Sequence, residues 1–336
     1  MPRNAQRSSS NEERDAKVLH WLLEESQPAV RYRALLDLQG RGERDLSVRT
    51  ARAAIGRVGW AATILHRQSA KGFWERREPR TVAEWVDFLY KPPFTSTIWN
   101  AQVLAELGMD VRDPRIRKVA DLLFNYKLRL GSPFNFFHEE VCIVGNTARM
   151  LTLFGLGDDP RVRRLRDWIL EDQRADGGWN CSQGTKGTLD VWEGLAALAA
   201  VPEARRLPAV TRAIERGAEF YLKRRLLREG SRYDPWLRFH FPNFYFYDVL
   251  VGLDLLTQLG YADDRRLAPA LAILRGKRRK DGTWAIDRAH PDLGKGVRIH
   301  PDPSKCRPLI LEAPGGPSKW VTLKAMTVLQ RVEQAS

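Results

Sequence analysis

The sequence predicts an all-α protein built from repeated helix pairs, and three short segments carry this prediction. Lys71-Gly72-Phe73-Trp74, Asp176-Gly177-Gly178-Trp179 and Asp281-Gly282-Thr283-Trp284 each place a tryptophan one or two residues after a glycine turn. The three tryptophans are 105 residues apart each time. Glycine ends a helix because it reaches left-handed backbone angles without steric cost. The unit is therefore a helix, a glycine turn, an aromatic plug and a second helix.

A second motif, a glycine followed by a polar loop with aspartates, recurs between the glycine-tryptophan segments and indicates a shorter repeat. Gly108, Gly155 and Gly260 each end an apolar stretch and precede a polar loop with aspartates. Gly108 and Gly155 are 47 residues apart, and Gly155 and Gly260 are 105 apart, about two such periods. This pattern is typical of a helix stop followed by an aspartate-capped helix. A period near 50 residues with two helices per unit indicates a helical repeat architecture.

Two classes of helix alternate along the chain. Apolar helices, which we expect inside, are predicted at 28–39, 95–107, 143–154, 189–200, 247–259 and 318–330. Amphipathic, arginine-rich helices, expected outside, are predicted at 13–24, 46–57, 113–126, 159–172, 207–224 and 263–276. Six inner and six outer helices suit a closed α/α barrel, or toroid. We expect residues 12–334 to form this single domain and residues 1–11 to be a disordered tail.

The element boundaries follow from local signals. Ser10 and Glu13 form a capping-box pattern for the first helix, and Pro28 suits the first turn of the second. Five loops join an outer helix to the next inner helix, so they should gather at one rim, beside the inner-helix N-termini. Helix N-termini offer unpaired N–H groups, and an aromatic-lined mouth there is the expected ligand site.

Composition fits a water-soluble protein without a disulfide framework. The chain carries 55 Lys and Arg against 41 Asp and Glu, a formal net charge of +14, and three cysteines. No apolar run reaches the ~20 residues of a membrane span, and the polar N-terminus lacks a signal peptide, so we expect a cytoplasmic protein. The basic residues are spread over outer helices without a nucleic-acid motif, so no specific nucleic-acid partner is predicted. Peripheral contact with an anionic membrane stays open.

The glycine-aromatic loops resemble the repeats of terpenoid cyclases, such as squalene cyclase, and of protein prenyltransferase β subunits. The segment from Asp176 to Leu198 carries most of this likeness, and Phe241 to Asp254 and Gly316 to Ala325 resemble bacterial single-domain members of the superfamily. The likeness covers most of residues 60–332. It implies a closed α/α toroid with an apolar central cavity and an isoprenoid or similar lipid as substrate.

The chemical motifs of that superfamily do not transfer intact. The sequence has neither the DxDD motif of protonating cyclases nor a DDxxD cluster for diphosphate ionisation. The zinc prenyltransferases use an Asp-x-Cys at an inner-helix start, but in Asp190-Val191-Trp192 the tryptophan replaces the cysteine. His138, Cys142 and Cys181 offer another set of zinc ligands, although buried free cysteines are commoner. We expect these three to lie too far apart for a metal, and no cofactor is predicted.

Carboxylates that interrupt apolar inner helices are the candidate catalytic groups. Asp190 and Glu193 are three residues apart and would share one helix face, while Asp248 opens the next inner helix. A carboxyl group in an aromatic cavity would stay protonated and could protonate an alkene or epoxide, whereas Asp190 and Asp248 could equally be helix caps. His138 completes the candidate catalytic set. The expected substrate-binding residues are Trp74, Phe136, Trp179, Trp192, His240, Phe244, Tyr245, Tyr247, Trp284 and Trp320.

The sequence thus favours a terpenoid-cyclase-like protein that binds or cyclises an isoprenoid by acid-initiated chemistry. Aromatic faces would stabilise the carbocation. Two other functions stay open. A carbohydrate-active α/α-barrel enzyme would use two carboxyl groups ~5–9.5 Å apart and stacked tryptophans. A non-catalytic lipid-binding or interaction scaffold would have a uniformly filled barrel.

Overall fold

The computed structural model describes residues 2–74, 96–125, 140–182, 184–227, 234–288 and 310–335. Within these ranges every regular element is a helix, and the β-pairing is a bridge between Ala285 and Pro317. The all-α class is therefore confirmed. In the same ranges, no helix combines the length and the apolar character that crossing a bilayer requires.

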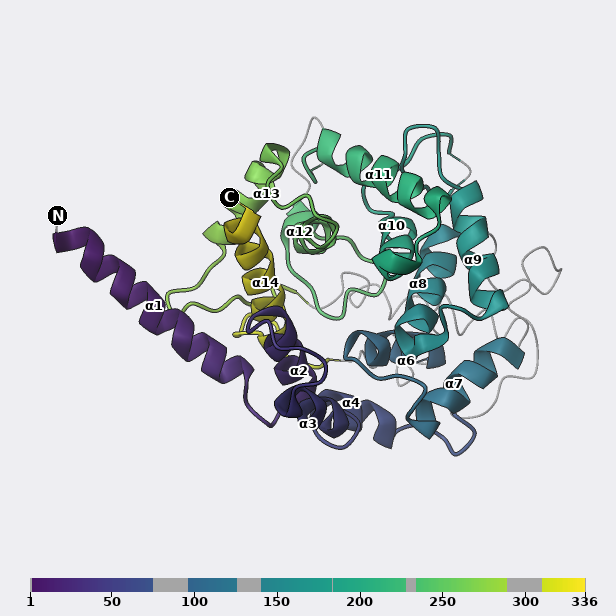
Figure 1. Cartoon of the computed structure of the whole chain (residues 1–336), viewed down its shortest axis with the longest axis horizontal. Helices are drawn as coiled ribbons and strands as arrows, with labels where there is room; N and C mark the ends of the chain where they lie inside the picture. The colour runs from purple at the N-terminus through teal and green to yellow at the C-terminus, as the bar shows by residue number, and fades with distance from the viewer. Residues whose placement is uncertain are drawn as a thin grey trace.

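The helices alternate between inner and outer positions around a common centre (Figure 1). The inner helices are α2 (Pro28–Asp37), α6 (Thr97–Glu106), α8 (Val141–Leu151), α10 (Glu193–Ala199), α12 (Val249–Gln258) and α14 (Lys319–Ala335). The outer helices are α1 (Pro2–Leu22), α3 (Leu46–Ala54), α7 (Pro114–Asn125), α9 (Pro160–Glu171), α11 (Pro208–Lys223) and α13 (Ala268–Gly276). Short 3₁₀ or π segments occur at Thr152–Leu156, Glu203–Arg205, Asp234–Leu237 and Arg265–Leu267.

Three details differ from the sequence-based prediction. Helix α1 begins at Pro2, inside the segment expected to be a disordered tail. An additional helix, α4 (Gly59–His66), packs between α2 and α6. Helix α10 begins at Glu193 and not at residue 189, because residues 189–192 form a turn after the Trp179 loop. The other inner and outer helices lie where the apolar pattern placed them.

The last helix returns to the first. Helix α14 packs against both α12 and α2. The Lys319 ammonium at its start reaches the Glu24 carboxylate at 2.8 Å, and the Gln330 amide donates to the Leu38 carbonyl at 3.3 Å. The N-terminal and C-terminal repeats are therefore in direct contact.

The three glycine-tryptophan turns, 105 residues apart, have the same local geometry. The indole N–H groups of Trp74, Trp179 and Trp284 donate to the carbonyls of residues 64, 169 and 274, each ten positions upstream, at 2.8–2.9 Å. The preceding glycines, Gly72, Gly177 and Gly282, have φ between 88° and 103°. Such positive angles are strained for any residue with a side chain, so the turn requires glycine.

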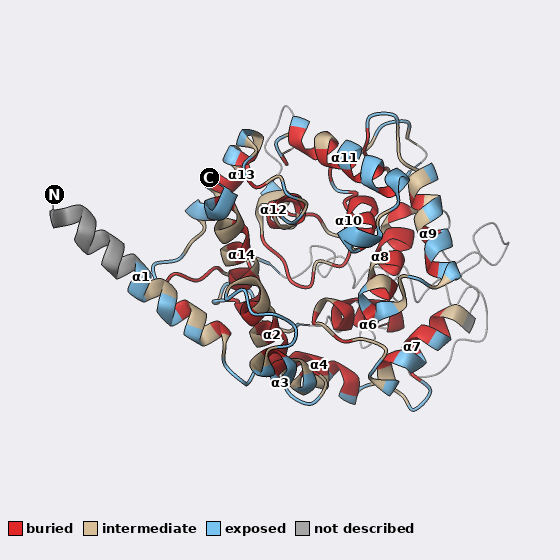
Figure 2. Cartoon of the chain, in the orientation of Figure 1, coloured by how far each residue is buried: buried red, intermediate tan, exposed pale blue. Residues whose placement is uncertain are grey.

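The second motif also has the expected structure. Asp113, Asp159 and Asp264 each accept a hydrogen bond from the backbone N–H two residues on, at 2.8–2.9 Å. The residue that donates is an arginine in all three copies, and its guanidinium pairs with the same carboxylate. These aspartates are therefore structural caps. Figure 2 shows that buried residues are concentrated on α6, α8 and α10, while exposed residues lie mostly on the outer helices.

Candidate functional site

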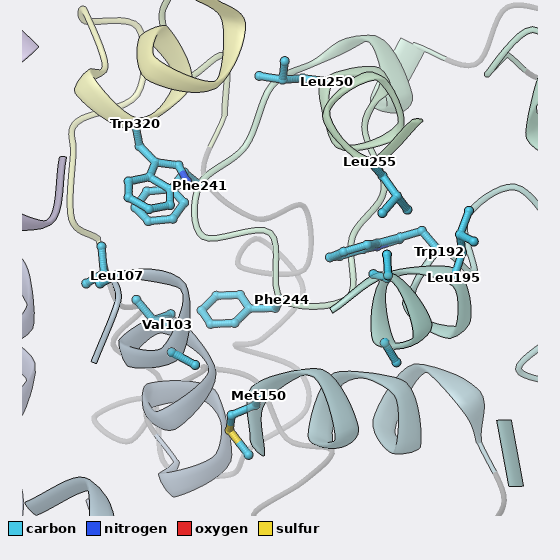
Figure 3. Close-up of a cluster of buried hydrophobic side chains, with 14 of the residues drawn as sticks. Val103, Leu107, Met150, Trp192, Leu195, Phe241, Phe244, Leu250, Leu255 and Trp320 are labelled. Atoms are coloured by element: carbon cyan, nitrogen blue, oxygen red, sulfur yellow. The ribbon is translucent and has the colours of Figure 1, made fainter. Parts of the chain in front are cut away.

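A central loop, residues 239–248, runs through the middle of the inner helices. The Phe244 carbonyl accepts from the Gln102 amide on α6 at 2.8 Å and from the Asn146 amide on α8 at 3.1 Å. At the other end of the loop, the Phe241 ring stacks on Trp320 of α14 with ring centroids 4.6 Å apart. Figure 3 shows both rings, with Phe244 extending toward Val103 and Met150. The loop therefore contacts helices on opposite sides of the centre.

A cavity of about 260 Å³ lies against this loop. Its wall is formed by parts of all six inner helices, and α6, α8 and α10 contribute residues from their C-terminal halves. Of the candidate site residues, Trp192, His240, Asp248 and Trp320 line it. The sequence predicted a mouth at the inner-helix N-termini, and α12 and α14 contribute residues from their N-terminal ends, as does Trp192 before α10. The residues from α6 and α8 lie at the opposite ends of their helices, so the cavity matches the expected place only in part.

The cavity wall is more polar than an isoprenoid site was expected to be. Arg149 pairs with Glu106 at 2.6 Å, and Lys324 pairs with Asp254 at 2.7 Å. Asp254 also binds Arg331 at 2.9 Å. Burial alone would raise the pKa of Asp254, but the charges of Lys324 and Arg331 outweigh it and hold that pKa well below its usual value.

The cavity cations also cover the aromatic rings. The Arg149 guanidinium lies 5.8 Å from the centre of the Trp192 ring, and the Lys324 ammonium lies 5.8 Å from that of Trp320. These distances fall within the range of cation–π attraction. A substrate carbocation at either ring would therefore meet a positive charge already in place.

Asp248 caps helix α12. Its Oδ1 accepts from the backbone N–H groups of Leu250 and Val251, both at 3.0 Å. Its Oδ2 accepts from the backbone N–H of His240 at 2.9 Å and from the Asn243 amide at 3.2 Å, and it lies 3.2 Å from His240 Nδ1. Both oxygens are thus used as acceptors, which suits a carboxylate and leaves no position for an acidic proton. The cap role that the sequence left open is the one the geometry favours.

We expect Asp248→Asn to cost more than an ordinary cap substitution, about 2–3 kcal/mol of unfolding free energy. If the asparagine oxygen keeps the two cap bonds, its NH₂ group replaces Oδ2. That group then faces the His240 backbone N–H, the His240 ring Nδ1 and the Asn243 amide, which donate to Oδ2 in the wild type. Urea denaturation would measure the loss. As a matched control, Asp159→Asn alters a less buried cap with fewer donors and should cost about 1 kcal/mol or less. Equal losses would show that the His240 contacts contribute nothing.

Glu193, the first residue of α10, is fully buried. Neither carboxyl oxygen has a hydrogen-bond partner within the described part of the chain. Its backbone fits closely against Gly145 of α8, where an added Cβ would lie 2.7 Å from the Glu193 carbonyl. Burial raises the pKa of Glu193 well above its usual value, and the nearby Cys181 thiol and Asp190 add to the shift, while Arg149 opposes it. Burial therefore favours the protonated form of this carboxyl.

Two free thiols adjoin this carboxyl. The side chains of Cys142 and Cys181 are in hydrogen-bond contact, and Cys142 Sγ lies 3.7 Å from the Glu140 carboxylate. The contact raises the pKa of Cys142 and lowers that of Cys181, while burial raises both. Two of the three predicted zinc-ligand candidates therefore lie together, while His138, the third, lies outside the described residues. In the described ranges, no three His, Cys, Asp or Glu side chains form a group that could hold a metal ion.

The remaining candidates divide into three groups. Asp190 is exposed in the turn before α10, so it does not share a helix face with Glu193. Trp179 and Trp284 are fully buried in the repeat turns and Trp74 is half-buried there, which favours a packing role. His138 and Phe136 lie outside the described residues.

Central-loop aromatics outside the cavity lining have partners in the packing. Phe244 and Tyr245 contact the Trp99 ring at centroid distances of 5.4 and 5.8 Å. The Tyr247 hydroxyl donates to the Leu226 carbonyl at 3.0 Å. These contacts hold the central loop in place.

Sequence reasoning missed Arg149 and Lys324 as cavity residues. Both are charged residues within inner-helix stretches that are otherwise mostly apolar, and this was the signal that could have found them. A charge on an inner helix must face either a partner or a cavity, because burial without compensation is costly.

Comparisons with known proteins give one weak likeness. No family model and no curated protein matches the sequence. Among solved structures, a variant of the type II terpene cyclase MstE from Scytonema, in complex with its substrate geranylgeranyl dihydroxybenzoate, aligns over 82% of this chain and 94% of its own. The sequence identity is 14% and the TM-score is 0.29. A likeness at this level does not assign the chain to a family or a function.

Proposed function

We propose that residues 12–334 form one closed α/α toroid that binds an isoprenoid or similar apolar lipid and converts it by acid-initiated chemistry, with Glu193 as the acid. The observation that carries the proposal is the Glu193 carboxyl, which is fully buried and has no hydrogen-bond partner among the described residues. Burial also raises its pKa well above the usual value. The contacts of α14 with α12 and α2 support the closed ring.

A neutral buried carboxyl suits this chemistry because it can deliver a proton to a group that water protonates poorly. Glu193 would add its proton to an alkene carbon or an epoxide oxygen of the lipid, and the positive charge would pass to the adjacent carbon. Loss of a proton from a neighbouring carbon would then end the reaction. Asp248 is not assigned the acid role, since both of its oxygens already accept hydrogen bonds.

The two other functions have less support. The carboxylates that line the central cavity are all engaged, Glu106 by Arg149, Asp254 by Lys324 and Arg331, and Asp248 by its donors. The described residues therefore offer no free acid pair in that cavity for hydrolysing a glycoside. A purely structural scaffold would have no reason to keep an unpartnered carboxyl in its interior, where it costs stability.

The test is turnover of an epoxidised isoprenoid. Purified protein would be incubated with the terminal epoxide of geranylgeraniol, and cyclic isomers of unchanged mass would be sought by gas chromatography with mass spectrometry. We expect Glu193→Gln, which keeps the side-chain shape, to reduce turnover at least 100-fold. Asp158→Asn, a change at a carboxylate that is 66% exposed outside the site, should leave turnover within twofold.

Two outcomes would contradict the proposal. Full turnover by a folded Glu193→Gln variant would place the acid elsewhere. If wild-type protein binds no isoprenoid by native mass spectrometry, the catalytic reading fails and the scaffold reading is favoured.

A further inference from the structure

The central cavity is separate from the proposed acid, because Glu193 is not among its lining residues. Its volume of about 260 Å³ lies near the lower end of the range for ligand pockets, ~300–1,000 Å³. A space of this size suits a compact molecule better than a long isoprenoid. We therefore expect this cavity to bind a ligand different from the lipid.

The net charge of the cavity wall indicates the charge of its ligand. The cavity is lined by three carboxylates, Glu106, Asp248 and Asp254, and by four cations, Arg33, Arg52, Arg149 and Lys324, so its lining carries one positive charge in excess. Arg149 and Glu106 form a neutral pair beside Trp192. The rings of Trp192 and Trp320 lie beside the cations and give the cavity flat walls.

The central loop adds a polar atom that is still unused. Asp248 is acceptor-only as a carboxylate, so His240 Nδ1 carries the proton that lies between them at 3.2 Å. In the neutral ring, Nε2 is then an acceptor, and it is buried without a partner among the described residues. The His240 side chain is 1% exposed, so this atom is not satisfied by bulk water.

Trp192 has a second buried polar group without a partner in the described part of the chain, and this one is a donor. Its indole N–H is also buried and has no partner within the described ranges. Buried polar groups are nearly always paired, so two exceptions on residues that line one cavity need an explanation. A ligand that offers one donor and one acceptor would satisfy both.

We propose that the central cavity binds a small organic anion that carries a hydroxyl group. Lys324 and Arg149 supply the counter-charge, and the Trp192 N–H donates to an anion oxygen. The hydroxyl donates to His240 Nε2, and Asp248 fixes the imidazole in the accepting tautomer. This site is additional to the lipid-binding function and does not depend on it.

Three rigid probes separate the two recognition elements. 4-Hydroxybenzoate has both the charge and the hydroxyl, benzoate lacks the hydroxyl, and 4-hydroxybenzamide lacks the charge. Titration calorimetry on the full chain should give a Kd of about 1 mM or lower for 4-hydroxybenzoate. The other two probes should bind at least tenfold more weakly.

Substitutions should remove recognition of the charge and recognition of the hydroxyl separately. Lys324→Met should weaken 4-hydroxybenzoate at least tenfold and leave 4-hydroxybenzamide unchanged, and Asp254 keeps its pair with Arg331. His240→Gln should weaken the two hydroxylated probes and leave benzoate unchanged. Lys223→Met removes a lysine whose side chain is 68% exposed on α11 and should change nothing.

If His240→Gln fails to fold, a measurement on the wild type tests whether the ligand hydroxyl binds His240 Nε2. In ¹⁵N-histidine spectra, 4-hydroxybenzoate should shift the Nε2 resonance of the imidazole that keeps its Nδ1 proton, and benzoate should not. The proposal is overturned if 4-hydroxybenzoate does not saturate the wild type at millimolar concentration. Equal binding of all three probes, or an equal loss with Lys223→Met, would also overturn it.

Discussion

Trp179→Ala should lower the free energy of unfolding by about 3–5 kcal/mol, the largest effect we expect from a single substitution. The ring is fully buried between α9, α10 and α11. Its neighbours cannot collapse into the space, because Gly194 and Gly217 face the ring: a Cβ on them would lie 2.5 and 3.1 Å from it. The substitution would leave a cavity and free the Ile169 carbonyl. Urea denaturation monitored by circular dichroism measures the loss.

Two control variants separate the ring from its hydrogen bond. Trp179→Phe keeps much of the buried surface but cannot donate to Ile169, so it should cost roughly half as much. Trp74→Ala, at the equivalent position of another repeat, should cost less than Trp179→Ala because Trp74 is only half-buried. If Trp179→Ala leaves the denaturation midpoint unchanged, the equivalence of the three glycine-tryptophan turns is wrong.

The second large effect is a pH dependence caused by Glu193. Because burial raises its pKa well above the usual 4.5, the folded chain keeps this proton where the unfolded chain has lost it. Folding then takes up a proton, so the free energy of unfolding falls as pH rises above the usual value. The slope from this group is roughly 1.4 kcal/mol per pH unit and persists until the raised pKa is reached.

Comparison with Glu193→Gln isolates this contribution, since the other titrating groups are common to both proteins. As pH rises from 5 to 8 the variant should become more stable relative to wild type, with a slope of up to roughly 1.4 kcal/mol per pH unit. Urea denaturation at each pH gives both curves. A stability difference that does not change with pH would mean that Glu193 ionises normally, and its assignment as an acid would fail.

The fold could be predicted in outline because its signals are local. Glycine turns at Gly72, Gly177 and Gly282 and the aspartate caps act within a few residues, so their spacing reveals the repeat directly. The start of α10 was misplaced because the turn at residues 189–192 has apolar residues at helical spacing. Helix α4 was missed because its eight residues are too few to establish a period.

The site was less predictable because its geometry depends on contacts between distant segments. That Glu193 would be buried without a partner depends on the fit of α10 against Gly145, 48 positions earlier in the chain. That Asp248 would hold His240 depends on the path of the central loop. Periodicity places a residue on a helix face, but it does not say which neighbour meets that face.

The central loop has a consequence for how the protein unfolds. A chain of repeats that touch only their neighbours can lose structure one unit at a time, from either end. Here the Phe244 carbonyl binds Gln102, 142 residues away, and Phe241 stacks on Trp320 of the last helix. These bonds link early, middle and late repeats, so loss of one should weaken the others. The protein should therefore unfold in a single cooperative transition, and such non-local contacts should make its folding slow for an all-helical chain.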